Sequence, residues 1–376
     1  MSERNPSDAP LQGIVVVDLT WNLPGPYASM ALQALGAEVV KVEPPKGDPA
    51  RHIGGLFAAL NEGKRVVTLD LRAEDGKREL EALVRRADVV LEGFRPGVAA
   101  RLGCDAAAVH AVNPDAVFCS ISAWGQEGPL RDLPGHDLNA QALAGVCHLG
   151  RSDDEHPHGL PLPVADLSAS MAAVASIVAE LYAREQRRAA GQAAAVALDV
   201  AMVDAVVSWA HTWSRVDLAA DAARRMPGRA RAVAGRWLQR LDRPRLHALP
   251  HYDVFRCADG RYLALGLVDE QHFWRALCEA LGAPRLGRLK MPTRLLLAPA
   301  LRRMIALRLR TASAEAWFER LGRAGVPTSP VLTPDEALRH PQIAARMVAP
   351  SGRVRAPLAQ RRVVPRPIPA DGGSGG

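Results

Sequence analysis

A single carboxylate, Asp166, stands where a proline-rich approach gives way to a helix of small apolar residues, in LPLPVADLSASMAAVASIVAELYA (160–183). A side-chain oxygen before a helix accepts hydrogen bonds from the unpartnered backbone N–H groups of its first turn. The helix dipole favours negative charge there, so we expect Asp166 to be ionised at neutral pH. An ionised carboxylate held in place is also able to attack a carbonyl carbon. This segment alone therefore leaves two roles open, helix cap and nucleophile.

The elements that lead up to Asp166 alternate between two patterns. Short runs rich in Val, Ile and Leu predict strands at 14–19, 37–43, 66–71, 88–94 and 116–122. Helical patterns lie between them, at 26–36, 74–86 and 99–112. Near-continuous apolar strands separated by helices are typical of a parallel sheet covered on both faces. The sequence therefore predicts an α/β fold with a Rossmann-like large domain.

The second half of the chain indicates another domain. A long helix is expected from Asp166 to about residue 188, followed by a strand at 194–200 and a helix from about 201. An arginine- and proline-rich passage at 224–250 precedes YDVFRCADGRYLALG (252–266), which indicates two strands joined by a turn. Helical segments follow near 270–281, 298–310 and 313–324. We expect a large domain at 11–200, completed by 325–360, a smaller α+β domain at 215–320, and disordered tails at 1–10 and 361–376.

Composition narrows the class of protein. A chain of 376 residues that is 48% hydrophobic is long enough for two globular domains. The net charge of +7 comes from 42 arginines and only five lysines, dispersed along the chain. Dispersed basic residues without an aromatic-studded stripe disfavour nucleic acid as a partner. They suit a phosphorylated small molecule, because guanidinium groups bind phosphate in a fork, although an arginine-rich genome would leave the same composition.

Several other classes of site are disfavoured. The five cysteines form no CxxC pair and no disulfide framework, and the DDEHPHG segment (153–159) lacks metal-ligand spacing. The turn before the first helix has no GxGxxG, which disfavours a nicotinamide or flavin cofactor. The N-terminus has no signal-peptide core, and we see no stretch near the ~20 apolar residues that span a bilayer. We expect a soluble, cytoplasmic protein without a membrane partner, a metal or a permanently bound cofactor.

A series of segments, in order, resembles the family III CoA-transferases, which include the α-methylacyl-CoA racemases. The segments are LGAEVVKVEPPKGDPAR (35–51), GKRVVTLDLR (63–72), ADVVLEGFRPGVAARLG (87–103), SISAWGQEGP (120–129), GHDLNAQALAG (135–145), AGQAAAVALDVAMVDA (190–205), YDVFRCADGRYLAL (252–265) and AGVPTSPVL (324–332). The similarity covers roughly residues 11–348, and the ordered series is more specific than any one member.

The resemblance implies a catalytic role for Asp166, with the helix cap as a compatible second role. In a transferase, Asp166 would attack the donor thioester to give a mixed anhydride and CoA thiolate. The thiolate would attack back to leave an aspartyl-CoA thioester, and the acceptor carboxylate would complete the exchange. The substrates implied are an acyl-CoA thioester and a carboxylic acid, and the acyl derivatives of Asp166 would need a site that excludes water.

The resemblance also implies contacts to coenzyme A at Leu69, Arg72, Phe94 and Arg101. Core packing would explain the two apolar residues equally well, and solvated charge would explain the two arginines. The sequence departs from part of the family, with Pro44 where some members carry a phosphate-binding arginine. We therefore expect Arg51, Arg72 or Arg101 to neutralise the phosphates.

GHDLNAQALAG separates the two branches of the family. The racemases resemble it in having a histidine where His136 stands, and this ring could remove the α-proton of an acyl-CoA while Asp166 returns a proton to the opposite face. Racemases also carry a glutamate after the hairpin, where this sequence has Asp269. Gln141, by contrast, is common in transferases. A structural histidine beside Asp137 is the alternative for His136.

We expect a CoA-transferase, because transferases are the commoner members, with 2-methylacyl-CoA racemisation as the alternative. A third hypothesis is a non-catalytic CoA-binding protein, against which Asp166 and His136 together argue. The resemblance further implies an interlocked homodimer, with the active site between the large domain of one subunit and the small domain of its partner. Folding and dimerisation would then be inseparable.

Overall fold

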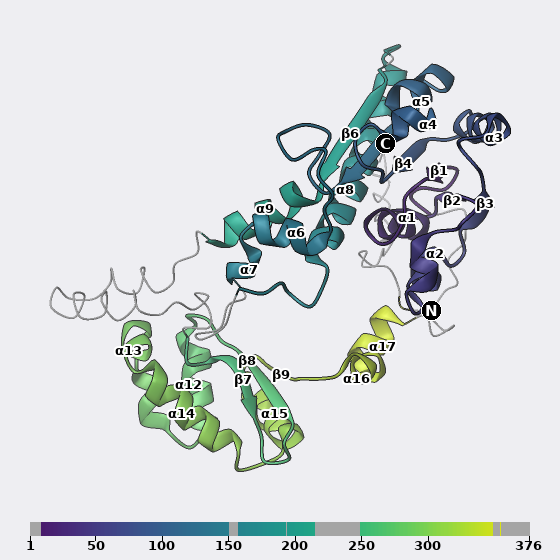
Figure 1. The fold of residues 1–376 in the computed structure, drawn as a ribbon. Helices are drawn as coiled ribbons and strands as arrows, with labels where there is room; N and C mark the ends of the chain where they lie inside the picture. Colours follow the sequence, from purple (N-terminus) through teal and green to yellow (C-terminus); the bar gives the residue numbers. More distant parts are fainter. Residues whose placement is uncertain (1–8, 150–156, 193, 215–248, 349–353, 355–376) are drawn as a thin grey trace, which may run out of the picture.

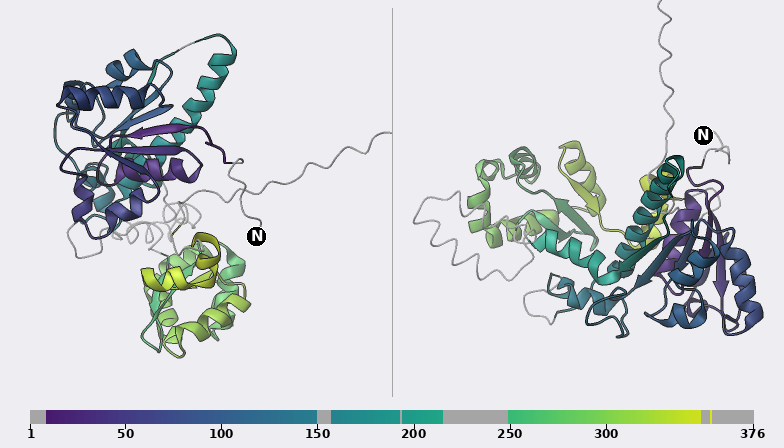
Figure 2. Two further views of the ribbon diagram at one scale, coloured as in Figure 1. Left: turned by 90° about the vertical axis from the view of Figure 1, so that its right-hand side faces the viewer. Right: turned by 90° about the horizontal axis from the view of Figure 1, so that it is seen from above.

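Two sheets lie in separate lobes of the molecule (Figure 1). The structure, a computed structural model, describes residues 9–149, 157–192, 194–214, 249–348 and 354. The larger sheet has six strands and the smaller has three, and the same separation is seen from two further sides (Figure 2). The predicted α/β fold, a parallel-sheet large domain with a smaller α+β domain, is confirmed. The segment 224–250 and both tails lie almost wholly outside the described residues.

The large sheet is parallel throughout and has the order β3-β2-β1-β4-β5-β6. Its strands are β1 (Val15–Asp18), β2 (Glu38–Glu43), β3 (Arg65–Thr68), β4 (Val89–Glu92), β5 (Val117–Ser122) and β6 (Val196–Ala201). Strand order reverses between β1 and β4, and in such sheets ligands bind in the crevice outside the carboxyl ends of the strands at this point. The topology therefore predicts a ligand site at the carboxyl ends of β1 and β4.

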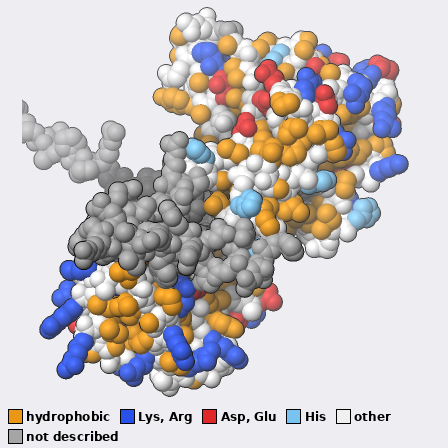
Figure 3. All heavy atoms as spheres, turned by 60° about the vertical axis from the view of Figure 1, so that its left-hand side comes forward, with side chains coloured by type: hydrophobic (Ala, Val, Ile, Leu, Met, Phe, Trp, Pro, Cys, Tyr) orange, Lys and Arg blue, Asp and Glu red, His pale blue; other side chains and the backbone are white. Residues whose placement is uncertain are grey.

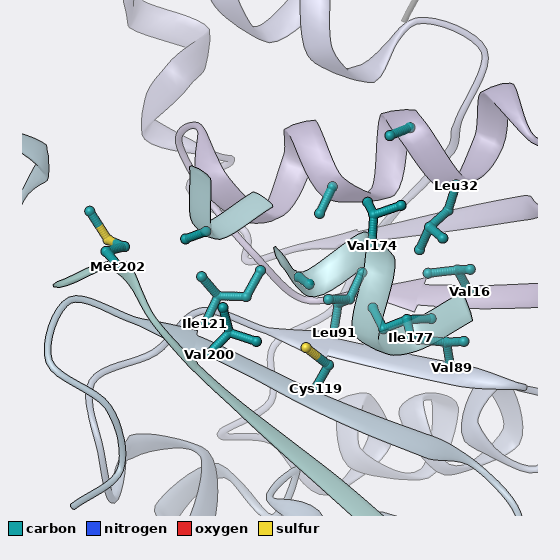
Figure 4. Close-up of a cluster of buried hydrophobic side chains, with 14 of the residues drawn as sticks. Val16, Leu32, Val89, Leu91, Cys119, Ile121, Val174, Ile177, Val200 and Met202 are labelled. Atoms are coloured by element: carbon teal, nitrogen blue, oxygen red, sulfur yellow. The ribbon is translucent and has the colours of Figure 1, made fainter. Parts of the chain in front are cut away.

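Helices cover both faces of the large sheet. They are α1 (Pro24–Ala34), α2 (Leu56–Asn61), α3 (Glu74–Val84), α4 (Val98–Leu102), α5 (Ala106–Val112), α6 (Asp137–Leu143), α7 (Val146–Leu149), α8 (Val164–Ala189) and α9 (Met202–Ser214), with a 3-10 turn at Pro49–His52. Alternate strand residues point to opposite faces. Val16 thus packs in the core beneath α1 and α8 (Figure 4), and Val17 in the core beneath α3, α4 and α5.

The stretch 99–112, predicted as one helical segment, forms two helices. Gly103 ends α4 in the left-handed conformation at φ 70°, which costs glycine little because it has no Cβ. Asp105 then begins α5 by accepting a hydrogen bond from the Ala108 backbone N–H at 3.2 Å. A C-terminal glycine followed closely by an aspartate cap therefore divides the segment.

The small domain is an antiparallel sheet with helices. It contains β7 (Tyr252–Arg256), β8 (Tyr262–Gly266), β9 (Thr328–Pro330), α12 (Gln271–Ala280), a 3-10 turn (Pro284–Arg288), α13 (Met291–Leu296), α14 (Ala298–Leu309) and α15 (Ala314–Arg323). The chain then continues through α16 (Pro334–Arg339) and α17 (Pro341–Met347). β9 pairs with β8, with Thr328 opposite Leu265. The third strand of the small sheet therefore comes from the stretch 325–360, which the sequence had suggested for the large domain.

Helix α8 corrects one expectation from the sequence. It is 26 residues long, and an 18-residue stretch of it has a mean hydropathy of 1.6, so by length and composition it matches a membrane-spanning helix. In the fold, 44% of that stretch is buried. Ala165, Ala169 and Ala173 of its inner face belong to the core beneath α1. Core helices of globular domains have this composition, so the match is weak evidence for a span.

Candidate active site

Asp166 is the third residue of α8 rather than its cap. The N-cap position is Pro163, which makes no side-chain capping bond. Instead the carboxylate of Asp137, the first residue of α6, accepts hydrogen bonds from the backbone N–H groups of Ala165 at 2.7 Å and Asp166 at 3.1 Å. Asp137 therefore performs across two helices the capping that we expected of Asp166 within one.

Gln141, one turn along α6, holds Asp137 in this position. Its amide nitrogen donates to Asp137 Oδ2, and its amide oxygen accepts from the Leu160 backbone N–H at 2.9 Å. The Gln141 side chain is buried. The residues that approach α8 are thus tied to α6 at two points, which leaves the Asp166 side chain standing on a fixed backbone.

Burial, followed by the negative charge of Asp137, raises the pKa of Asp166 to about 7. The expectation that the helix dipole would keep Asp166 ionised at neutral pH is therefore wrong. The N–H groups at the helix start are directed at Asp137, so they stabilise that carboxylate and not Asp166. Near neutral pH, Asp166 exists in both its ionised and its protonated form.

Ser170 joins the start of α8 to the carboxyl edge of the large sheet. Its hydroxyl lies 2.7 Å from the carbonyl oxygens of both Asp166 and Pro24. Pro24 begins α1, directly after the turn that follows β1. Asp166 is therefore next to the point where the strand order reverses.

Two aromatic side chains lie at this reversal point. Trp21 follows β1, Phe94 follows β4, and their rings meet edge to face at 5.7 Å between centroids. Phe94 is half-buried and Trp21 is 36% exposed. Leu69, which follows β3, is 6% exposed within the core. Of the two apolar residues expected to contact coenzyme A, Phe94 offers the more accessible surface.

The three arginines expected to bind the phosphates of coenzyme A differ in their contacts. Arg72 and Arg101 are exposed, whereas Arg51 makes a two-pronged contact with buried Glu43, at 2.8 Å for each nitrogen–oxygen pair. The Arg51 guanidinium also lies 3.6 Å from the centre of the Phe57 ring. A phosphate would have to compete with Glu43 for Arg51, but not for the other two.

A buried set of charges beneath the turn after β1 was not anticipated from the sequence. Lys64 lies 3.4 Å from Asp18, and Lys41 lies 2.9 Å from Asp48, with all four side chains inaccessible to solvent. Burial alone would raise the pKa of Asp18, but the two lysines hold it at about 2. Asp48 also accepts from the backbone N–H of Asn22, at 3.1 Å. The sequence signal for this cluster was a charged residue in each of two apolar strands, Asp18 in VVVD and Lys41 in EVVKVE.

The other two predicted catalytic residues lie in different places. His136 is exposed and immediately precedes Asp137, so α6 brings it to the same end of α8 as Asp166. Asp269 is on the small domain, half-exposed, with its carboxylate 3.6 Å from the buried guanidinium of Arg294. Arg294 in turn donates to the ring of His251 at 3.0 Å. The structure therefore groups His136 with Asp166 and holds Asp269 on the other domain.

The site is one of carboxylates, a histidine and aromatic rings. Among the residues that the structure describes, no group of three or more His, Cys, Asp or Glu side chains is placed to hold a metal ion. What the arrangement offers chemically is a carboxylate that titrates near neutrality, next to the crevice where a parallel sheet of this order takes its ligand.

Comparison with known proteins identifies close resemblances. A family model described as CoA-transferase family III matches residues 11–366. The chain is 31% identical to acetyl-CoA:oxalate CoA-transferase of Acetobacter aceti, over 95% of this chain and 90% of that protein. It is 35% identical to succinate–glutarate CoA-transferase of Agrobacterium fabrum over 47% of each chain. A solved CAIB/BAIF family protein from Brucella suis superposes with a TM-score of 0.76 and 27% identity, covering 94% of this chain and 93% of that one.

Proposed function

The chain belongs to CoA-transferase family III, and from this premise we propose that it moves coenzyme A between carboxylic acids through covalent intermediates on Asp166. The observation that carries the proposal is the placement of Asp166, with its pKa raised to about 7, on a helix turn that Ser170 joins to the residues after β1, where the strand order reverses. A carboxylate of raised pKa is a stronger nucleophile than an ordinary one, and it is still ionised in a large fraction of molecules at neutral pH.

The proposed reaction begins when an Asp166 oxygen attacks the thioester carbonyl and the carbon–sulfur bond breaks. This gives a mixed anhydride and CoA thiolate. The thiolate then attacks the Asp166 acyl carbon, which releases the donor acid and leaves an aspartyl-CoA thioester. The acceptor carboxylate repeats the two steps in reverse order, forming an anhydride and then its own CoA thioester, and Asp166 is freed as a carboxylate. No net oxidation or proton change occurs.

The residues around Asp166 support this role. Because Asp137 and Gln141 fix the first turn of α8, the carboxylate meets its substrate from a rigid support. Coenzyme A would lie along the carboxyl edge, past Phe94, and would reach the exposed side chains of Arg72 and Arg101. The guanidinium groups would meet the phosphates as fork-shaped donors.

Trapping tests the covalent step. Incubation with a panel of acyl-CoA donors, followed by hydroxylamine, is expected to convert Asp166 to a hydroxamate that peptide mass spectrometry detects. Asp166→Asn should abolish labelling and lower the transfer rate by roughly 10³-fold or more, as loss of a covalent nucleophile does. Unlabelled Asp166 across the panel, with transfer intact in Asp166→Asn, would exclude this mechanism.

One observation favours a second candidate function, racemisation of 2-methylacyl-CoA. His136 lies next to Asp137, and therefore at the same end of α8 as Asp166. Inversion through proton removal and return requires two proton-transferring groups, and a histidine and a carboxyl group are suited to this. In deuterated water, a racemase would exchange the α-proton of a 2-methylacyl-CoA, and His136→Ala would stop the exchange. Transfer of CoA between acids without exchange would eliminate this alternative.

We also propose that the protein works as a homodimer. Large apolar side chains on α6, on α9 and on the approach to α8 are 40% to 64% exposed in the single chain: Leu138, Leu143, Leu160, Leu162, Val207 and Trp209. Hydrophobic side chains gather on the large domain in Figure 3. Exposed apolar surface of this kind around a site indicates an interface, and a second copy would bring its own Asp269 towards it.

A further inference from the structure

A second buried carboxyl group, Glu92, lies at the carboxyl edge and has no part in the mechanism above. It is the last residue of β4 and is 3% exposed. Its Oε2 accepts from the Phe94 backbone N–H at 2.7 Å, and its Oε1 accepts from the hydroxyl of Ser120, its register partner on β5. In the described part of the chain Glu92 forms no ion pair, which is unusual for a buried carboxylate.

Among the described residues, the titratable groups that interact electrostatically with Glu92 are a carboxyl group and two thiols. They are Asp199 of β6, Cys119 of β5 and Cys104, which precedes α5. Burial comes first among the causes that raise the pKa of Glu92 to about 7, and Asp199 adds to it, against the hydrogen bonds from Ser120 and Phe94. Glu92 is therefore able to gain or lose a proton in the neutral range.

The hydrogen bonds of Glu92 reach two parts of the site. Ser120 also accepts from the side-chain amide of Gln126 at 2.7 Å, and the Gln126 backbone N–H donates to Asp199 at 2.8 Å. Gln126 belongs to the connection between β5 and α6, which leads to His136. On its other side, Glu92 holds the backbone of Phe94 at the reversal point of the strand order. A protonated Glu92 could donate to Ser120 and still accept from Phe94.

We propose that Glu92 takes up a proton when coenzyme A or its thioester binds beside Phe94. The inference rests on the proposed function for the class of ligand. The ligand brings several phosphate charges to the carboxyl edge and removes water from it, and both effects disfavour the ionised form of a buried carboxyl group. Binding and protonation are then linked, so the ligand binds more tightly as the pH falls through neutrality.

Isothermal titration calorimetry with free coenzyme A tests the linkage. The full-length protein should carry Asp166→Asn, because Asp166 also titrates near pH 7 and its loss prevents turnover. Titrations at pH 7 in buffers of different ionisation enthalpy give the number of protons taken up. If binding raises the pKa of Glu92 by one unit, the expected uptake is about 0.4 proton, and affinity should change roughly tenfold across the linked range.

Adding Glu92→Gln should remove this uptake, since the amide keeps the shape, its oxygen can accept from the Phe94 N–H and its nitrogen can donate to the Ser120 hydroxyl. The difference between the two proteins cancels protons exchanged by the ligand's own phosphate. The control is Glu127→Gln, which removes one negative charge from an exposed residue in the connection between β5 and α6. It should leave the proton uptake unchanged. Asp199→Asn is the second variant, expected to move the pH of maximal uptake downwards.

The failures are distinguishable. If coenzyme A binds and the uptake is the same with and without Glu92, the linkage to Glu92 is wrong while the proposed function stands. If coenzyme A does not bind at all, the proposed function fails and the linkage fails with it.

Discussion

At the scale of single residues, the behaviour of Asp166 is set by a neighbour that its own segment does not contain. Asp137 takes the N–H groups of the first turn of α8 and leaves its negative charge beside Asp166. The sequence had directed the first-turn N–H groups at Asp166 itself, whereas the structure directs them at Asp137. Local patterns describe caps within a segment, whereas this cap comes from 29 residues away.

Asp137→Asn should move the pH dependence of the reaction. In the proposed mechanism Asp166 attacks in its ionised form, so in the native protein kcat/KM is expected to fall as the pH drops below about 7. Removing the neighbouring charge lowers the pKa of Asp166, and the acid limb of the profile should shift to lower pH. Asp132→Asn, an 80% exposed carboxylate in the connection that leads to α6, is the control and should leave the profile in place. An unshifted limb in Asp137→Asn would contradict the electrostatic role.

At the scale of elements, the strands of the large sheet were predictable because each is a short run of branched apolar residues. The longer helices that were predicted start and end within a few residues of the observed ones, because their hydrophobic pattern is local. The segment 99–112 divides, where Gly103 and Asp105 together outweigh the helical pattern, and the short helices α2, α6, α7 and α13 were not predicted. The charges within β1 and β2 were visible in the sequence, but their pairing was not, because Lys64 lies 46 residues from Asp18.

The four buried charged side chains near the end of β1 are expected to contribute jointly to the free energy of unfolding. Asp18→Asn leaves Lys64 and Lys41 short of a counter-charge in a buried place, which is expected to cost about 3–5 kcal/mol of unfolding free energy. Adding Lys64→Met removes part of that uncompensated charge, so the double variant should be less destabilised than the sum of the two single variants. Urea denaturation of all four proteins measures this. Strict additivity would mean that the two residues do not act together.

At the scale of the whole molecule, the predicted catalytic carboxylates are divided between two domains. Asp166 is on the large domain, and Asp269 is on the small one, where buried Arg294 pairs with it. No residue pattern could have shown whether the two meet within a chain or between chains, because that depends on how domains and copies assemble. The exposed apolar side chains near α6 and α9 favour assembly between chains.

If Asp269→Asn alone is inactive, as Asp166→Asn is expected to be, mixing the two variants tests whether subunits share their active sites. If each active site combines Asp166 of one subunit with Asp269 of the other, refolding an equal mixture of Asp166→Asn and Asp269→Asn chains should restore about a quarter of the native activity. The estimate follows from random pairing into closed dimers, where half of the dimers carry one intact site of two. Light scattering should give twice the chain mass. A mixture as inactive as its parents would place each site within one subunit.

The late position of β9 bears on how the protein is made. The six strands of the large sheet are complete once the ribosome has passed residue 201, and Asp166 is then already in its helix. The small sheet must wait for Thr328–Pro330, more than a hundred residues later. At translation rates of about 5–20 residues per second, a nascent chain spends several seconds with its amino-terminal lobe assembled and its second lobe unfinished. During that interval chaperones would meet a finished large sheet followed by a small domain that still lacks its third strand.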